Sequence, residues 1–184
     1  MAKYLSFTFV IIVSLLLLYF YPMLNSYEQM DQISYNVTYK ATTNFVDSVR
    51  TKGYITPTMY NDFQKELGKT DNLFDVQLEH DQKKYTPVYA DPADPNTFKG
   101  EYGVHYEGFF NEQILGKLFP DNNLPLNDPS RRYLLRVGDT FSVTVKNKNM
   151  TKATLVRDFL NNGNTSDPTR IYVPYGGMVL NEDY

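Results

Sequence analysis

Cysteine and tryptophan are both absent from this chain of 184 residues. Without cysteine there is no disulfide framework, no zinc–thiolate site, no c-type haem attachment and no thiol catalysis. A basic excess is also lacking, because 18 Lys and Arg face 21 Asp and Glu and the net charge is −3. Proteins that bind nucleic acid usually carry such an excess, so we expect no nucleic-acid partner. The 16 Tyr and 12 Phe make the chain too apolar for a disordered protein.

Motifs of the common catalytic sites are missing as well. The sequence contains no G-x-S-x-G, H-E-x-x-H, P-loop or G-x-G-x-x-G pattern. The two histidines, His80 and His105, fall in predicted strands, where we expect both on the strand surface. The sequence therefore predicts a protein that is not an enzyme, with no cofactor and no small-molecule substrate.

An uncharged apolar run occupies residues 4–21, YLSFTFVIIVSLLLLYFY. A bilayer core is spanned by ~20 apolar residues that rise ~1.5 Å each, so this run is long enough to cross it. Tyrosines lie at both ends of the run, where the aromatic belts of membrane proteins are found. The alternative is a cleaved secretory signal, whose apolar core is shorter and ends at a small-x-small site. Because Leu24 fits poorly in such a site before Ser26, we predict that residues 1–25 form an uncleaved transmembrane anchor.

Charged residues on either side of this anchor predict its orientation. Lys3 is the only basic residue near the N-terminal end, whereas Glu28 and Asp31 follow the other end. Under the positive-inside rule the N-terminus is then cytoplasmic and the rest of the chain is extracellular. We expect a single-pass protein of the cell membrane with its head domain at the cell surface.

Residues 26–53 carry apolar side chains at steps of three or four, which is typical of an amphipathic helix. This stripe consists of Tyr27, Met30, Ile33, Val37, Ala41, Phe45 and Val49. Gly53 is a suitable helix stop, and Pro22 is expected to kink the helix near the membrane exit. We predict a helical stalk that continues the anchor and packs its stripe on a sheet; a coiled coil is the alternative.

The remaining residues, 54–184, predict an α+β head domain. Helices are expected over 57–68, after an N-cap at Thr56, and over 109–118 and 150–160. Alternating apolar residues predict strands over 73–80, 84–89, 102–106, 133–137, 140–146, 170–174 and 178–180. Gly138-Asp139 predicts a hairpin, and Tyr175-Gly176-Gly177 a second hairpin or a bend. The order of elements favours a small antiparallel sheet with short helices and with the long helix as its main cover.

Three loops rich in Asp and Asn offer oxygen ligands of the kind that calcium prefers. They contain Asp91, Asp94 and Asn96; Asp121, Asn122 and Asn123; and Asn162, Asn164 and Asp167. None has EF-hand spacing, and Asp and Asn favour turns because they bond to nearby backbone. Turn chemistry is therefore the preferred interpretation, and we assign no metal ligand. We expect the pair Arg131-Arg132 to be solvated.

An apolar helix that continues as an amphipathic helix and carries a small α+β head resembles type IV pilins and pseudopilins. The segments YKATTNFVDSVRTKGYITPTMYNDF, PSRRYLLRVGDTFSVTVKNKN and VPYGGMVLNEDY resemble single-pass proteins associated with Tad (tight adherence) pilus gene clusters of Gram-positive bacteria. Prepilins carry a basic leader that ends in Gly, and a Glu at the fifth position of the apolar run. Here no Gly precedes the run, and Phe7, Thr8 and Phe9 stand where the Glu would be. The comparison therefore favours a membrane-retained accessory or minor pilin-like protein over a processed major subunit.

This resemblance implies a structural or assembly component of a Tad or type IV-like pilus or secretion apparatus. Its partners would be the membrane and other pilin-like or pilus-assembly proteins, including copies of itself. The residues expected to carry membrane insertion and assembly are Tyr4, Phe7, Phe9, Ile12, Leu16, Met30, Ile33, Val37, Ala41 and Phe45. The alternative is a membrane-tethered binding module, a sensor or adhesin, with a head stabilised by calcium.

Overall fold

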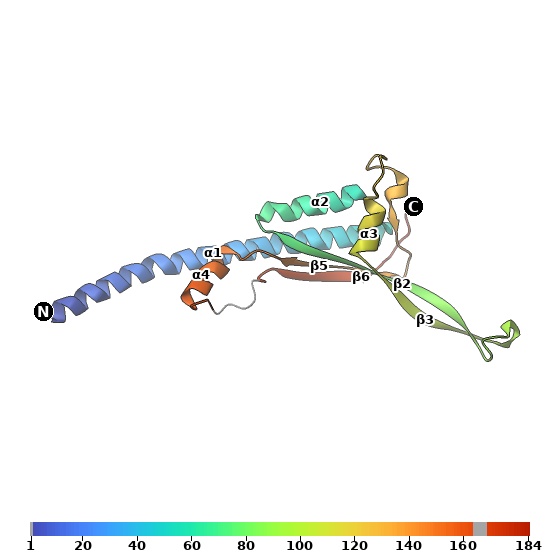
Figure 1. Cartoon of the computed structure of the whole chain (residues 1–184), viewed down its shortest axis with the longest axis horizontal. Helices are drawn as coiled ribbons and strands as arrows, with labels where there is room; N and C mark the ends of the chain where they lie inside the picture. Colours follow the sequence, from blue (N-terminus) through green and yellow to red (C-terminus); the bar gives the residue numbers. More distant parts are fainter. Residues whose placement is uncertain (1, 164–168) are drawn as a thin grey trace.

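The computed structural model describes residues 2–163 and 169–184, and for Ala2 the backbone alone. Within them the fold is α+β, with one long N-terminal helix, shorter helices and antiparallel sheets (Figure 1). The predicted fold class is confirmed at this level. The molecule is elongated: the N-terminal part of the long helix projects at one end and a two-stranded arm projects at the other.

Helix α1 (Ala2–Lys52) joins the predicted anchor and stalk in 51 residues. At ~1.5 Å per residue it is roughly 75 Å long. Pro22 lies inside the helix, which continues on both sides of it. The helix ends at Gly53, whose φ of 76° is a left-handed conformation that suits glycine and whose N–H bonds to the carbonyl of Val49 at 2.7 Å. The predicted stop is therefore confirmed.

The main sheet has four antiparallel strands in the order β3-β2-β5-β6. Their bounds are β2 Phe74–Tyr89, β3 Phe98–Phe110, β5 Thr140–Asn147 and β6 Tyr172–Met178. Pairing of β2 with β5 stops at Asp81↔Thr140, whereas pairing of β2 with β3 goes on to Tyr89↔Phe98. The two strands predicted over 73–80 and 84–89 are thus one strand, and its outer part leaves the sheet with β3 as the arm of residues 82–107 (Figure 1).

The predicted hairpin around Gly138-Asp139 is wrong. β4 (Tyr133–Leu134) pairs with β1 (Tyr54–Ile55), which directly follows α1, and not with β5. A turn does exist here, since the Asp139 N–H donates to the carbonyl of Arg136 at 3.0 Å. The Asp139 carboxylate accepts from backbone N–H groups of β2 and of the segment before the turn. These side-chain hydrogen bonds replace the ladder that a hairpin would have formed.

A hairpin or bend at Tyr175-Gly176-Gly177 is also wrong, because β6 runs through these residues. The glycines allow close approach instead. A Cβ on Gly176 would lie 2.5 Å from Cβ of Ser142 on β5, and one on Gly177 would lie 2.7 Å from the guanidinium carbon of Arg50. Arg50 of α1 crosses β6 here and donates from Nε to a β6 carbonyl at 2.9 Å. Glycine at position 177 lets α1 dock directly on the last strand, and glycine at position 176 lets β6 lie close to β5.

The core lies between the C-terminal half of α1 and the sheet, with α2 (Pro57–Leu67) and α3 (Asn111–Leu118) at its sides. Phe45 of α1 stacks on Phe63 of α2 with ring centroids 4.6 Å apart, and meets Phe141 of β5 edge-on at 6.1 Å. The stalk therefore packs on the sheet of its own chain, as predicted. The last helix, α4 (Lys152–Leu160), lies beside α1 at the end of the head nearest the N-terminus (Figure 1).

Candidate membrane and assembly surface

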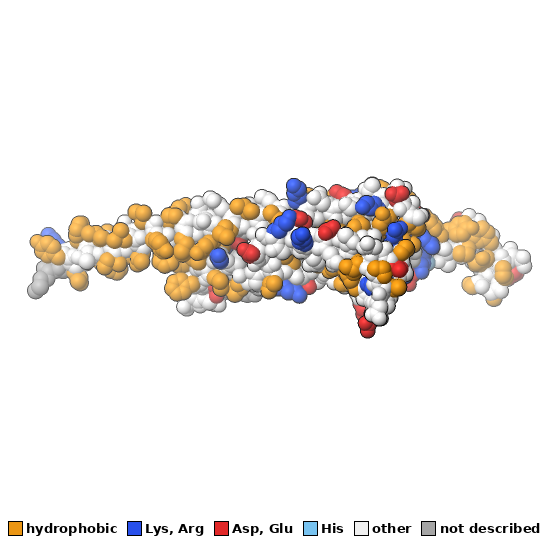
Figure 2. Space-filling view, turned by 90° about the horizontal axis from the view of Figure 1, so that it is seen from above, with side chains coloured by type: hydrophobic (Ala, Val, Ile, Leu, Met, Phe, Trp, Pro, Cys, Tyr) orange, Lys and Arg blue, Asp and Glu red, His pale blue; other side chains and the backbone are white. Residues whose placement is uncertain are grey.

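The N-terminal half of α1 is apolar and stands clear of the head. The insertion residues predicted here are all exposed, with fractions from 51 to 80%: Tyr4, Phe7, Phe9, Ile12 and Leu16. In Figure 2 hydrophobic side chains surround this end of the molecule. Exposure of apolar surface to water costs ~25 cal/mol per Å². By length and composition, α1 is able to cross a membrane.

The predicted stripe of the stalk divides between solvent and core. Met30 and Ile33 are exposed, Val37 is half-buried, and Ala41 and Phe45 are buried. Each step of four residues advances about 40° around a helix of 3.6 residues per turn, so the stripe winds round the axis. The buried face combines three residues of the predicted stripe with three outside it. These residues are Ala41, Phe45 and Val49, and Thr38, Thr42 and Val46. Met30 and Ile33, the N-terminal part of the stripe, therefore remain exposed. They form an apolar strip that leads from the apolar half of α1 toward the head.

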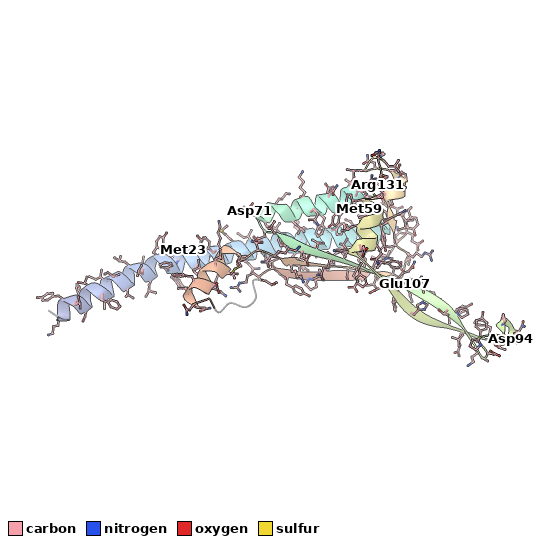
Figure 3. All side chains as sticks on the ribbon, viewed as in Figure 1. Met23, Met59, Asp71, Asp94, Glu107 and Arg131 are labelled. Carbon is pink, nitrogen blue, oxygen red and sulfur yellow. The ribbon has the colours of Figure 1, made fainter. Side chains whose placement is uncertain are left out.

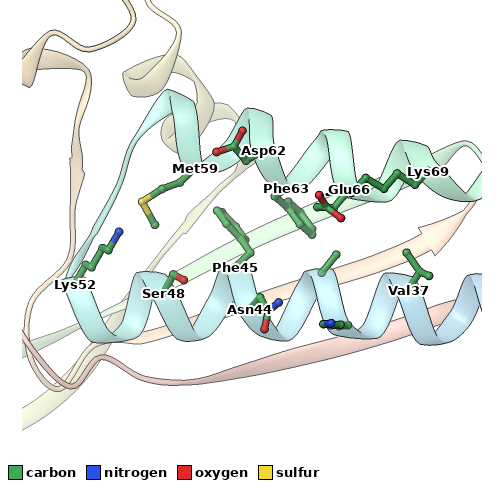
Figure 4. A pocket seen from close by; sticks show the side chains of 12 residues that line it. Val37, Asn44, Phe45, Ser48, Lys52, Met59, Asp62, Phe63, Glu66 and Lys69 are labelled. Atoms are coloured by element: carbon green, nitrogen blue, oxygen red, sulfur yellow. Dashed lines mark hydrogen bonds and ion pairs between the residues drawn. The ribbon is translucent and has the colours of Figure 1, made fainter.

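The C-terminal part of the stripe lines a groove between α1 and α2 (Figure 4). Its volume is about 470 Å³. Apolar side chains that line it are Val37, Ala41, Phe45, Met59 and Phe63. Charged side chains that line it are Lys40, Lys52, Lys69, Asp62 and Glu66. An apolar floor with a mixed charged rim suits packing of another amphipathic element better than binding of a small charged ligand.

The arm of residues 82–107 is amphipathic, because side chains of directly opposed residues share a face of the ribbon. One face, called here the aromatic face, carries Tyr85, Pro87, Tyr89, Phe98, Tyr102, Val104 and Tyr106, with Lys83 at its inner end, where its Nζ lies 5.2 Å from the centroid of the Tyr85 ring. The opposite face carries Gln82, Lys84, Thr86, His105 and Glu107. Asp94 lies at the tip (Figure 3). Tyr85, Tyr102 and Tyr106 are each close to 60% exposed.

The sequence carries a signal for this arm beyond the separate strands predicted over 84–89 and 102–106. Tyr102, Val104 and Tyr106 alternate with polar or small residues, and Tyr85 and Pro87 flank Thr86 on the partner strand. Read together, the two runs predict a ribbon with one apolar face. The proline pointed to an edge strand, and β2 indeed has a partner on one side only along the arm.

The prediction for His80 is wrong, because its side chain is buried rather than on the strand surface. Its Nδ1 lies 2.8 Å from the Tyr133 hydroxyl and its Nε2 lies 3.0 Å from Asp139 Oδ2. Phe109 stacks on the imidazole with centroids 5.6 Å apart. Burial, and the nearby Asp139 charge, raise the pKa of Tyr133 to about 12. The three polar groups satisfy one another and tie β2 to the segment before β5; His105, by contrast, is exposed as predicted.

The acidic loops are organised by their own hydrogen bonds. Asp91 Oδ1 accepts from the Ala93 N–H and Asp94 Oδ1 from the Asn96 N–H, both at 2.9 Å. Such bonds are ordinary turn chemistry. In residues 2–163 and 169–184 no group of three or more His, Asp or Glu converges as metal ligands. In the third loop, Asn164 and Asp167 lie outside the described residues.

Arg131 corrects a further expectation, because it is buried and not solvated. Its Nη2 donates to the carbonyl of Leu124 and to Oδ1 of Asn122, both at 2.8 Å. A guanidinium therefore gathers oxygen atoms of the loop at 120–130.

No family model, curated protein or solved structure matches the chain. Three features of the molecule bear on function: the exposed apolar half of α1, the groove between α1 and α2, and the aromatic face of the arm.

Proposed function

We propose that this chain is a membrane-anchored structural or assembly component of a Tad or type IV-like pilus or secretion apparatus, with its head outside the cytoplasm. One observation carries the proposal: α1 is a single helix whose N-terminal half is apolar and exposed and whose C-terminal half is the spine of the head. The anchor and the head are thereby joined by a continuous helix, without a connecting loop.

In this role the exposed strip of the stalk provides the contact between neighbouring subunits. Met30 and Ile33 are 48% and 62% exposed, although apolar residues at the start of a head domain would be costly to leave in water. The strip runs into the groove between α1 and α2, so a neighbouring helix that leaves the bilayer beside α1 meets a continuous apolar track. The partners are then other pilin-like proteins or copies of the chain itself.

A charge placed on the strip tests this proposal. Ile33→Asp is expected to leave the head folded, because the side chain is exposed, and to remove the protein from its assembly. Gln32→Asp adds the same charge at the preceding residue, which is polar and exposed, and is the control. Both variants are followed in membranes and in sheared surface filaments, with limited proteolysis to report head folding. Ile33→Asp that assembles as the parent chain does would contradict the proposal.

A second candidate, a membrane-tethered binding module, is favoured by the arm. The arm projects from the head (Figure 1), its aromatic face is exposed, and Tyr and Phe are enriched where proteins bind partners. In this case Tyr85→Ser with Tyr102→Ser abolishes attachment of cells to their target surface, whereas Lys84→Ser with Thr86→Ala on the opposite face does not. Loss of assembly with unchanged attachment in the Ile33→Asp strain would separate the two functions.

A further inference from the structure

Helix α4 is short and leaves its largest apolar side chains exposed. Thr151 caps it by accepting from the Thr154 N–H at 3.2 Å, and Ala153 and Thr154 are buried on its inner side. Leu155, Phe159 and Leu160 on its outer side are 52%, 77% and 58% exposed. Three large apolar residues in nine exceed what a short surface helix of a soluble head needs.

The position of α4 along α1 is set by two polar contacts. Thr151 Oγ1 donates to Asp31 Oδ2 at 2.7 Å, and the Arg157 guanidinium pairs with Glu28. α4 therefore runs toward the N-terminus of α1, as Figure 1 shows. Leu160, three residues beyond Arg157, lies a further ~4–5 Å in that direction. It reaches the level of α1 where the apolar run gives way to charged residues.

The neighbouring surface of α1 fits this placement. Leu24 and Tyr27, on the same helical face as Glu28 and Asp31, are half-buried, while residues 3–19 are exposed. The exposed side of α4 thus continues the apolar surface of the anchor at the boundary between its apolar and polar parts. Figure 2 shows hydrophobic side chains gathered where the anchor meets the head.

We propose that α4 is an interfacial helix that rests Leu155, Phe159 and Leu160 on the surface of the same bilayer that α1 spans. The inference deepens the proposed function, because it takes α1 as the membrane anchor. An amphipathic helix binds such an interface through buried apolar area. The anchor holds α4 beside the surface at all times, so even a small patch is occupied. Contact at α1 and α4 together fixes the tilt and rotation of the head.

Charge plays little part in this contact. Lys152, Arg157 and Arg170 stand against Glu28, Asp31 and Asp158 at this end of the head, so the two signs balance. Binding is then insensitive to the anionic lipid content of the membrane. A neighbouring protein subunit is the competing occupant of the patch, and the experiment below distinguishes it.

The absence of tryptophan permits a direct test with single reporters. The full chain is placed in phosphatidylcholine vesicles with lipids brominated at shallow or deep acyl positions. Phe159→Trp reports on α4, Leu16→Trp on the middle of the anchor and Tyr102→Trp on the distant arm. We expect blue-shifted emission from Phe159→Trp, with loss of intensity that is greater for shallow than for deep bromine. Leu16→Trp is quenched most by deep bromine and Tyr102→Trp by neither, and anionic lipid changes none of these results.

The other outcomes separate the two proposals. If Phe159→Trp has solvent-like emission that bromine does not quench, while Leu16→Trp is quenched, the role of α4 is overturned and the anchor remains in place. Unquenched Leu16→Trp means that α1 does not span the bilayer, and the proposed function fails with the inference. Blue-shifted but unquenched Phe159→Trp, which depends on protein density in the vesicle, identifies a protein as the occupant and also overturns the lipid contact.

Discussion

Asp139 is the residue on which the base of the arm depends. Its carboxylate accepts from the N–H groups of Lys83 and Arg136 at 2.9 and 2.8 Å, and Oδ2 also faces His80. The contact with Lys83 forms just beyond Asp81, the last residue of β2 that pairs with β5. One buried side chain thus substitutes for a missing strand, and it satisfies backbone groups that would otherwise be unpaired.

Asp139→Asn is expected to destabilise the head by about 1–3 kcal/mol, because the amide nitrogen cannot accept from an N–H and leaves one buried donor unpaired. The thermal unfolding midpoint of the detergent-solubilised chain measures the effect. Asp81→Asn removes a nearby carboxylate on the outer side of β2 and is expected to change stability by less than about 0.5 kcal/mol. Equal effects of the two substitutions would show that the network around His80 is unimportant.

Tyr133 predicts an alkaline dependence of stability. Its pKa in the folded state is about 12, against an ordinary value of 10.0, so folding favours the neutral phenol. The corresponding stability is fully present below pH 10 and is lost as the pH rises toward 12. After allowance for partial exposure of the ring, we expect about 1–2 kcal/mol.

Tyr133→Phe removes this ionisable group and keeps the ring. Thermal unfolding of the parent and variant, followed between pH 9 and about 12, should show a gap that narrows at high pH. Two curves that remain parallel over that range would exclude the proposed contribution. The variant also loses the hydroxyl contact with His80, so it starts less stable at neutral pH.

At the scale of elements, the junction between α1 and the rest of the head depends on Gly53. This glycine has a φ of 76°, and a Cβ there would lie 2.3 Å from the carbonyl oxygen of Asn181. The C-terminal segment passes directly over the end of the helix. No other residue type fits both the conformation and the space.

Gly53→Ala is therefore expected to cost about 2–4 kcal/mol, from backbone strain and from displacement of the C-terminal segment. Gly116→Ala provides the matched control, because Gly116 lies within α3 and has open space around it. It is expected to stabilise the head by about 0.5–1 kcal/mol through helix propensity. Urea unfolding measures the free energy of unfolding of both variants, which should fall for Gly53→Ala and rise for Gly116→Ala. A Gly53→Ala variant as stable as the parent would refute the packing around Gly53.

Elements proved easier to predict than their pairings. The Thr56 cap, the Gly53 stop and the alternation of Phe141, Val143 and Val145 are local signals, and each element lies where they indicate. The pairing of β4 with β1 depends on residues far apart in the chain, and no local pattern encodes it. Gly176 and Gly177 resembled a turn because close approach, to β5 and to Arg50 respectively, uses the same residue type as a turn.

The candidate membrane and assembly surface was likewise predicted only in part from local sequence patterns. Composition alone identified the apolar half of α1, since eighteen or more uncharged residues in a row are distinctive. Which stalk residues face the core was only partly predicted, because the stripe winds and Met30 and Ile33 rotate out of the interface. His80 was misplaced because an alternating strand shows which residues share a face, but a polar residue on the inner face needs partners that only the fold supplies.

At the scale of the whole molecule, the C-terminal segment of the chain packs on the C-terminal end of α1, far from the N-terminus (Figure 1). The Leu180 and Asp183 N–H groups donate to the carbonyls of Arg50 and Lys52, both at 2.8 Å. Glu182 accepts from the Val137 N–H at 2.7 Å. The last carbonyls of a helix lack partners within it, and here the C-terminal segment supplies them.

Removal of residues 180–184 is expected to cost the head about 2–4 kcal/mol, since several hydrogen bonds at about 1 kcal/mol each are lost together. Tyr184→Phe, which deletes only the hydroxyl bonded to the Leu135 carbonyl, should cost less than about 1 kcal/mol. Protease resistance of the head in membranes measures both. A truncated chain as resistant as the parent would show that the helix end needs no such cover.

This closure has a consequence for how the protein is made. The face of α1 that carries Val46 and Val49 is synthesised early, yet the strands that bury it, β5 and β6, come from residues 140–178. Contacts between such distant parts of a chain form late and slowly. The apolar face of the stalk therefore stays uncovered until β5 and β6 have been synthesised. A cell that makes this protein must shield that stalk throughout translation.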